Sequence, residues 1–240
     1  MSTSGTSSRR GAGIIPFGTD QLGRDVLSRL VYGIRATVFL SLLTMAITAA
    51  LGACVGLVSG FFRNRIDDVL MRICDVMMSF PSEVMILAIV GMMGPGLENV
   101  VIANVVAKWP WYARMVRSIV RQYSDKDYIR FAKVAGGSSI RIMMRHLLPG
   151  TAGELFVLTT LDTGSVILMI SALSFLGLGV QPPTPEWGMM LNEAKEVMTM
   201  YPLQMIPAGM AILLVVAAFN FLGDSLRDAF DPKHAGRERS

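Results

Sequence analysis

The chain has 240 residues, of which 52% are hydrophobic and 17% are charged, and its mean hydropathy is positive. This composition excludes an ordinary soluble domain and predicts an all-α integral membrane protein. The formal net charge of +4 is small, and a soluble nucleic-acid-binding protein would have no use for long apolar segments, so no nucleic-acid partner is expected.

Residues 1–35 are predicted to form an external segment ahead of the first membrane span. Its start, MSTSGTSSRRGAG, is followed by no apolar core of signal-peptide length. Further on, Gly18, Asp20, Gly23 and Asp25 predict an ordered turn in which the aspartates cap the backbone, a structural role more than a ligand site.

Five apolar segments approach the roughly 20 residues that a helix needs to cross a bilayer. The third is the weakest because it contains Lys108 and Pro110, and Pro81 in the second and Pro110 in the third predict kinks. In the first segment, Gly52, Gly56 and Gly60 recur every four residues, which predicts one closely packed helix face. The predicted spans are residues 36–62, 69–93, 97–115, 151–178 and 202–222.

If the chain crosses the membrane at each predicted span, every second connection lies on the same side. Basic residues gather in one such set of connections, which predicts that this side is cytoplasmic. Residues 36–223 then form the transmembrane domain and residues 224–240 a cytoplasmic tail. Fifteen of the 22 lysines and arginines fall on this side, namely Arg63, Arg65, Arg72, Arg114, Arg117, Arg121, Lys126, Arg130, Lys133, Arg141, Arg145, Arg227, Lys233, Arg237 and Arg239.

The number of spans conflicts with the charge rule at the N-terminus. Five spans and a cytoplasmic C-terminus place the N-terminus outside, together with Arg9, Arg10, Arg24, Arg29 and Arg35. We therefore expect that a transmembrane helix precedes this segment in the complete architecture.

The densest block of charge, residues 125–149, reads DYIRFAKVAGGSSIRIMMRHLLP from Asp127 onward. Gly136, Gly137 and the serines after them interrupt an amphipathic pattern, which predicts two short helices that meet at a bend. Pro149 is expected at the start of the next span. By composition alone, such a block is most often a helix lying on anionic lipid.

The order of residues in this block resembles the conserved cytoplasmic loop of ABC-importer permeases, which has the pattern E-A-A, three residues, G, nine residues, I-x-L-P. Ala132 and Gly136 match its second Ala and its Gly, Leu148 and Pro149 match its end, and Arg130 and Phe131 replace the Glu and the first Ala. The resemblance implies that this loop docks on an ATPase subunit. Its implied coupling residues are Tyr128, Arg130, Phe131, Ala132, Gly136, Gly137 and Pro149.

Three further stretches resemble the C-type permease subunit of peptide, nickel and opine importers. They are PFGTDQLGRDVLSRLVYGIR (16–35), SFLGLGVQPPTPEWGMML (174–191) and AFNFLGDSLRDAFDP (218–232). The resemblance implies a type I importer transmembrane domain, usually of six spans, with two ATPase subunits, a homologous permease and an extracytoplasmic binding protein as partners. WPWYARMVRS (109–118), TLDTG (160–164) and YPLQM (201–205) are most similar to the nickel-transport branch.

Asp162 is the ionisable residue placed deepest in a predicted span, so it is the candidate pore residue. A carboxylate there would attract a cationic substrate or a hydrated metal, and the alternative is a hydrogen bond to a partner subunit. Asp75 and Lys108 are expected to reach water or to pair locally. Trp187 is expected to anchor a short helix, 186–198, at the membrane interface.

No catalytic residue, metal site or cofactor is predicted. Cys54 and Cys74 are interpreted as buried thiols, and no Walker-type loop occurs, so ATP is expected to bind a separate protein. The leading hypothesis is a permease subunit in the inner, cytoplasmic membrane that imports nickel or a metal chelate. A di- or oligopeptide importer is the nearest alternative, and an intramembrane enzyme or a scaffold without transport is more distant.

Overall fold

The computed structural model describes residues 17–230, and every element in this range is helical. Residues 1–16 and 231–240, which include Lys233, Arg237, Arg239 and the outer ends of two of the motif stretches, lie outside it. The elements are α1 (Val26–Phe62), α2 (Arg65–Met78), α3 (Ser82–Met93), α4 (Leu97–Ser124), α5 (Asp127–Val134), α6 (Ser139–Ile142), the π-helix η1 (Met143–Leu147), α7 (Leu148–Phe175), α8 (Trp187–Lys195), the 3-10 helix η2 (Pro202–Met205) and α9 (Ile206–Phe230).

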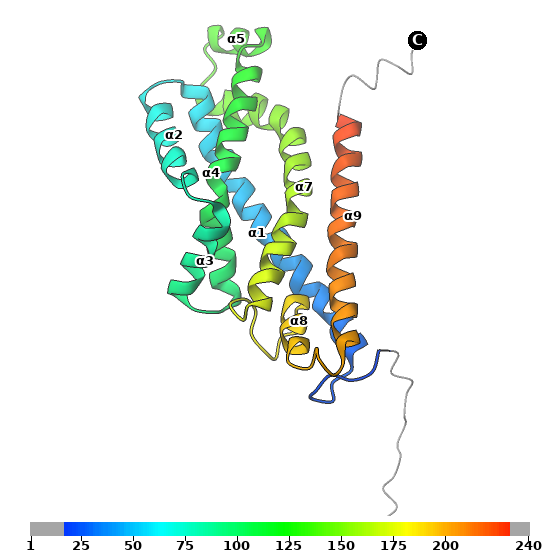
Figure 1. Ribbon diagram of the computed structural model, residues 1–240. Helices are drawn as coiled ribbons and strands as arrows, with labels where there is room; N and C mark the ends of the chain where they lie inside the picture. Colours follow the sequence, from blue (N-terminus) through cyan, green and yellow to red (C-terminus); the bar gives the residue numbers. More distant parts are fainter. Residues whose placement is uncertain (1–16, 231–240) are drawn as a thin grey trace, which may run out of the picture.

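The long helices form a bundle whose two ends differ (Figure 1). One end carries the α1–α2 connection, the end of α9 and a segment that we call the elbow, residues 127–147, which comprises α5, the glycine turn, α6 and η1. The other end, the α8 end, carries the start of α1, the α3–α4 turn and α8. The predicted grouping of the basic connections at one end is therefore present in the fold.

Three helical stretches in the described part of the chain are long and apolar enough to cross a membrane, namely Val26–Phe62, Ser139–Phe175 and Pro202–Phe230. The bent pair α2–α3 counts as a fourth if it is one span. Together they contain the predicted first, second and fifth spans and all of the fourth except its last three residues, 176–178. The predicted third span lies in α4, which does not meet this measure of apolarity and carries Glu98, Lys108 and Arg114.

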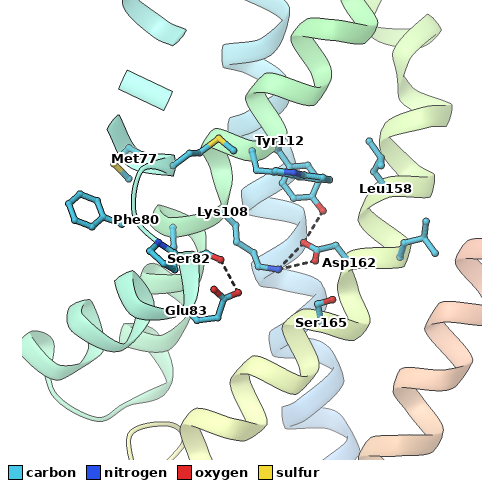
Figure 2. Close-up of a pocket in the computed structure, with 14 residues that line it drawn as sticks. Met77, Phe80, Ser82, Glu83, Lys108, Tyr112, Leu158, Asp162 and Ser165 are labelled. Atoms are coloured by element: carbon cyan, nitrogen blue, oxygen red, sulfur yellow. Dashed lines mark hydrogen bonds and ion pairs between the residues drawn. The ribbon is translucent and has the colours of Figure 1, made fainter. Parts of the chain in front are cut away.

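The predicted kink at Pro81 is confirmed, because α2 and α3 meet there at 80°. Proline fixes its own φ and disfavours helical geometry in the residue before it, so the chain leaves one helix and starts another. The break turns the first residues of α3, Ser82 and Glu83, toward the middle of the bundle (Figure 2).

The glycine stripe of α1 faces α4, as the spacing predicts. A Cβ atom added at Gly52 would lie 2.3 Å from Tyr112 Cβ, one at Gly56 would lie 2.6 Å from the Ala113 carbonyl oxygen, and one at Gly60 would lie 2.8 Å from Val120 Cβ. All three distances are below ordinary contact, so only glycine permits this approach of the two helices.

Helix α8 packs against α7, α9 and the start of α1, and this corrects the interpretation of Trp187. Its side chain is only 2% exposed, lies against Gly33 and donates its indole N–H to the Leu30 carbonyl at 2.9 Å. The buried Glu186 caps α8 by accepting from the backbone N–H groups of Gly188 and Met189. Trp187 is therefore a core residue and not an interfacial anchor.

The two cysteines differ in their surroundings. Cys74 on α2 is fully buried, as expected, whereas Cys54 on α1 is exposed on the bundle surface. Cys54 follows Ala53, which belongs to the face that packs on α4, and so it points away from that contact. An apolar sequence context did not distinguish the packed face from the outer face of the helix.

Candidate functional site

A cavity of about 710 Å³ lies where the α2–α3 break, α4 and α7 come together (Figure 2). Met77, Met78 and Phe80 line it from the end of α2 and the break, and Ser82 and Glu83 line it from the start of α3. Lys108, Trp111 and Tyr112 come from α4, and Leu158, Asp162 and Ser165 from α7. The cavity therefore has apolar walls with charged groups of both signs.

An ion pair joins α4 to α7 across this cavity. Lys108 Nζ donates to both carboxylate oxygens of Asp162, at 2.9 and 3.0 Å, and the Tyr112 hydroxyl donates to Asp162 Oδ2 at 3.1 Å. Lys108 and Tyr112 are one helical turn apart, so they reach Asp162 from the same face of α4. The expectation that Lys108 pairs locally is wrong, because its partner lies 54 residues away in the sequence.

Both members of the pair remain accessible from the cavity. The Lys108 side chain is 16% exposed and the Asp162 side chain 22% exposed, whereas Tyr112 is fully buried. The hydrogen bonds of Asp162 stay within this chain, so the alternative of a bond to a partner subunit is not needed to account for its burial. Whether Asp162 faces a transport pore stays a prediction.

Two further carboxylates fix α2 to α4, and sequence reasoning did not identify this role. Asp67 is buried and forms ion pairs with Arg117 and Arg121. Asp75 is exposed and pairs with Arg114, again at long range and not locally. The arginines recur at intervals of three and four along α4, a pattern that places them on one face.

The elbow has the predicted bend, and its geometry depends on glycine. Helix α5 ends in a Schellman motif, in which the N–H groups of Gly136 and Gly137 donate to the carbonyls of Lys133 and Ala132 at 3.1 and 3.0 Å. Gly136 has a φ of 78°, which side-chain-bearing residues rarely adopt. A Cβ atom at Gly137 would lie 2.8 Å from the Ala132 oxygen.

The apolar residues of the elbow divide between two faces. Ile129, Ile142 and Leu147 are buried against α1 and α4, with Ala132 partly buried beside them. On the outer side, Phe131 is 78% exposed and Val134 88% exposed, and the other exposed members are Tyr128, Ile140 and Met144. The amphipathic pattern of the sequence does not separate these two faces, and it does not single out Ile129 as the anchor.

The elbow continues into α7 through the five-residue π-turn η1. Leu148 donates its N–H to the Met143 carbonyl, five residues back. Pro149, exposed at the second position of α7, has no N–H to donate and its ring would collide with the carbonyl four residues back, so a wider turn accommodates it. Pro149 thus lies at the start of the span, where it was expected.

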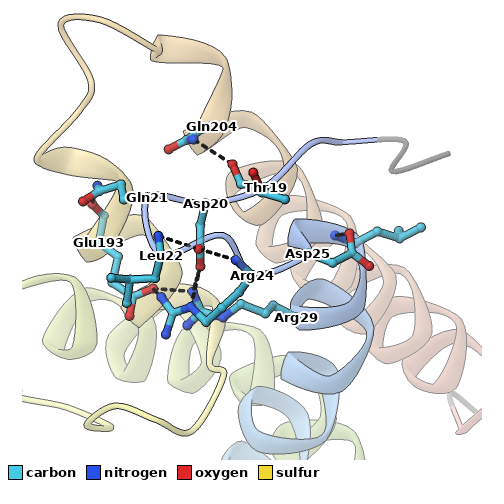
Figure 3. A network of polar contacts seen from close by, with 10 residues as sticks. Thr19, Asp20, Gln21, Leu22, Arg24, Asp25, Arg29, Glu193 and Gln204 are labelled. Carbon is cyan, nitrogen blue, oxygen red and sulfur yellow. Dashed lines mark hydrogen bonds and ion pairs between the residues drawn. The ribbon is translucent and has the colours of Figure 1, made fainter. Parts of the chain in front are cut away.

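A second polar cluster holds the α8 end together (Figure 3). Asp20 accepts from the backbone N–H groups of Leu22 and Arg24, as the predicted capping turn requires, and from the guanidinium of Arg29 at 2.7 Å. Glu193 on α8 also pairs with Arg24 and Arg29. Partial burial opposes ionisation of Asp20, but the hydrogen bonds from Arg24 and Arg29 outweigh it and hold its pKa below the ordinary value.

In residues 17–230 no group of three or more His, Cys, Asp or Glu side chains is arranged to hold a metal ion. The predicted site residues instead fall into two separate places. Asp162 lies in the cavity between α4 and α7, and Tyr128, Arg130, Phe131, Ala132, Gly136, Gly137 and Pro149 lie in and next to the elbow.

A helical membrane bundle with a broken second span, a charged central cavity and an exposed elbow defines a protein of the transport-permease class. The chain belongs to the family of binding-protein-dependent transport system inner membrane components, whose family model matches residues 52–235. The match covers the cavity and the elbow.

Three relatives share comparable identity with the chain. The metal-staphylopine import system permease protein CntC of Staphylococcus aureus is 42% identical over 222 residues, which are 92% of this chain and 77% of that protein. The nickel transport system permease protein NikC of Escherichia coli is 40% identical, over 90% and 78% of the two chains. The di/tripeptide transport system permease protein DppC of Pseudomonas aeruginosa is 44% identical, over 90% and 71%.

The fold is similar to that of a solved structure of the methionine ABC transporter MetNI in an inward-facing conformation. The TM-score is 0.67 and the sequence identity 15%, over 86% of this chain and 98% of the solved one. This similarity confirms the expected all-helical transmembrane fold of a type I importer.

Proposed function

We propose that this chain is a transmembrane permease subunit of an ATP-driven importer, and that the importer moves nickel or a related metal chelate across the cytoplasmic membrane. The family assignment and the relatives named for nickel and metal-staphylopine transport support this substrate class. A di- or tripeptide substrate is the second candidate, favoured by the 44% identity to DppC.

The observation that carries the proposal is the outer face of the elbow. It presents large apolar side chains beside basic ones at one end of the bundle, where exposed apolar groups cost free energy unless a partner covers them. We assign this surface to two separate ATPase subunits that dock on the permease pair, each through one elbow. The coupling residues are then Tyr128, Arg130, Phe131, Ala132, Gly136, Gly137 and Pro149.

The remaining assignments follow from this docking. The elbow end, with the end of α9 and the C-terminal tail, faces the cytoplasm, and the α8 end faces an extracytoplasmic substrate-binding protein. A homologous permease covers the open side of the cavity, and lipid covers the rest of the bundle. Residues 36–223 form the transmembrane domain, with the coupling region at 125–149.

Copurification tests the docking surface. Phe131→Ser removes an exposed apolar side chain without opening the core, and it is expected to release the ATPase subunits from the detergent-solubilised complex. Leu22→Ser is the matched control, because Leu22 is 73% exposed at the opposite end of the bundle.

Gly136→Ala provides an independent variant, since alanine is strained at this φ and the elbow changes shape. Gly18→Ala introduces the same strain at the α8 end, with a φ of 71°, and is expected to retain the ATPase subunits. Equal ATPase retention in all four variants would refute the assignment of the elbow.

A further inference from the structure

The Lys108–Asp162 pair is placed unusually for a structural clamp. The pair joins α4 to α7, but both of its side chains remain partly exposed in a cavity of about 710 Å³. That volume is within the range of sites that bind small molecules. Asp162 is also held in position, because the fully buried Tyr112 donates its hydroxyl to Asp162 Oδ2 at 3.1 Å, independently of Lys108.

The charges of the cavity favour some ligands over others. A bare metal cation attracted to Asp162 would have to displace the ammonium group of Lys108, and the ion pair and both of its hydrogen bonds would be lost without replacement by the ligand. A ligand that carries a carboxylate as well as a cationic group avoids this cost, because its carboxylate becomes the new partner of Lys108 while its cationic group takes Asp162.

The rest of the lining is consistent with such a ligand. Glu83, brought to the cavity by the Pro81 break, gives two carboxylates against one ammonium group. The surplus negative charge favours ligands whose net charge is zero or positive. Met77, Met78 and Trp111 supply apolar and polarisable surface for the uncharged part of the ligand.

We propose that Lys108 and Asp162 form a charge-exchange site for amphoteric amino-carboxylate ligands, which open the internal ion pair by supplying both of its counter-charges. This proposal rests on the proposed function and refines its substrate class. The metal enters inside an amino-carboxylate chelate and not as a bare hydrated ion, and a peptide enters through its two charged termini.

Uptake into proteoliposomes containing the complete transporter tests the site with two sets of probes. One set is L-alanyl-L-alanine, its N-acetyl derivative, which is an anion, and its amide, which is a cation. The other is 63Ni²⁺ as the chloride and 63Ni²⁺ with excess L-histidine. Wild-type transporter is expected to take up the zwitterionic dipeptide or the histidine chelate at least tenfold faster than the other members of its set.

The single variants give opposite changes in charge preference. Lys108→Met is expected to lower uptake of the zwitterionic probe at least tenfold and to spare the amide. Asp162→Asn is expected to lower it similarly and to spare the N-acetyl form. Asp75→Asn is the control, because the Asp75–Arg114 pair also joins two helices, α2 and α4, but does not line the cavity. Uptake by this variant is expected to equal that of wild type.

The double variant Lys108→Met, Asp162→Leu tests whether the ion pair binds the ligand or only holds α4 against α7. Well-packed apolar residues often replace an ion pair without loss of stability. Suppose that the double variant takes up the probes at the wild-type rate and that each single variant lowers uptake of all probes by the same factor. This result would overturn the charge-exchange site, but it would not contradict the permease function. If the wild-type transporter takes up no member of either set, the proposed substrate classes fail and this inference fails with them.

Discussion

The close contact between α1 and α4 makes Gly52→Ala a sensitive test of the fold. The added Cβ atom would lie 2.3 Å from Tyr112 Cβ and 3.0 Å from the Ala113 backbone nitrogen, whereas ordinary contact begins at 3.4 Å. The two atoms must therefore separate by about 1 Å. No flexible side chain can move aside, because the nearest atoms belong to the backbone or to a Cβ atom.

Overpacking of this kind costs about 3 kcal/mol, and the better helix propensity of alanine offsets about 1 kcal/mol of it. A net loss of about 2 kcal/mol corresponds to a fall in Tm of roughly 4–8 °C for a chain of this size. The midpoints are measured in detergent at one fixed heating rate, because membrane proteins commonly unfold irreversibly.

Gly91→Ala on α3 and Gly209→Ala on α9 are the controls, since a Cβ atom at either position would meet nothing within 4 Å. They gain the same helix propensity without the collision, so their Tm values should equal or exceed that of wild type. If Gly52→Ala melts within about 1 °C of these controls, the described packing of α1 on α4 is wrong.

Two further predictions concern the α8 end. Glu186→Gln replaces a buried carboxylate that accepts hydrogen bonds from the backbone N–H groups of Gly188 and Met189, so it should lower the free energy of unfolding by about 2 kcal/mol and lower Tm. Glu196 is exposed, so Glu196→Gln is the control and should leave Tm unchanged. Equal Tm values for the two variants would contradict the capping role of Glu186. Because the pKa of Asp20 is depressed in the folded protein, its stabilising contribution is present above its unfolded pKa of about 3.9 and is lost as pH falls through the lower folded value. The difference in Tm between wild type and Asp20→Asn should therefore be largest near neutral pH and shrink below about pH 4, and a difference that stays constant from pH 7 to pH 3 would contradict this linkage.

Most of the helical layout follows from local features of the sequence. Hydropathy predicts five spans, and four of them lie in helices of the described part of the chain that are long and apolar enough to cross a membrane. Pro81 predicts the break, and the glycine spacing in α1 predicts a packed face. These features act over one or two helical turns, so they are visible without knowledge of tertiary contacts.

The errors occur where a distant element decides the outcome. Trp187 resembles an interfacial anchor because it follows a proline-rich loop, but Gly33, 154 residues earlier, leaves the space in which its indole is buried. The partner of Lys108 depends in the same way on how α4 lies against α7. The sequence does carry one signal for this pair, because an unpaired lysine or aspartate inside a membrane costs free energy and each would favour the other as a partner.

The candidate site was likewise predicted only in part from the sequence. Asp162 was identified from its depth in a span, and the bend of the elbow from its double glycine. The separation of the elbow's apolar residues into an anchoring set and an exposed set was missed, because α5 carries apolar residues on both sides and its periodicity alone does not assign a face.

The π-turn at the base of α7 joins α6 to α7 as one continuous helical rod, Ser139–Phe175, which runs from the elbow to the cavity. Asp162 lies 23 residues along this rod from Ser139, or about 35 Å. A tilt of only about 5° pivoted at the elbow would carry its carboxylate through about 3 Å. That displacement is close to the 2.9 Å length of the Lys108–Asp162 hydrogen bond, so a small tilt of this helix would be enough to break the ion pair.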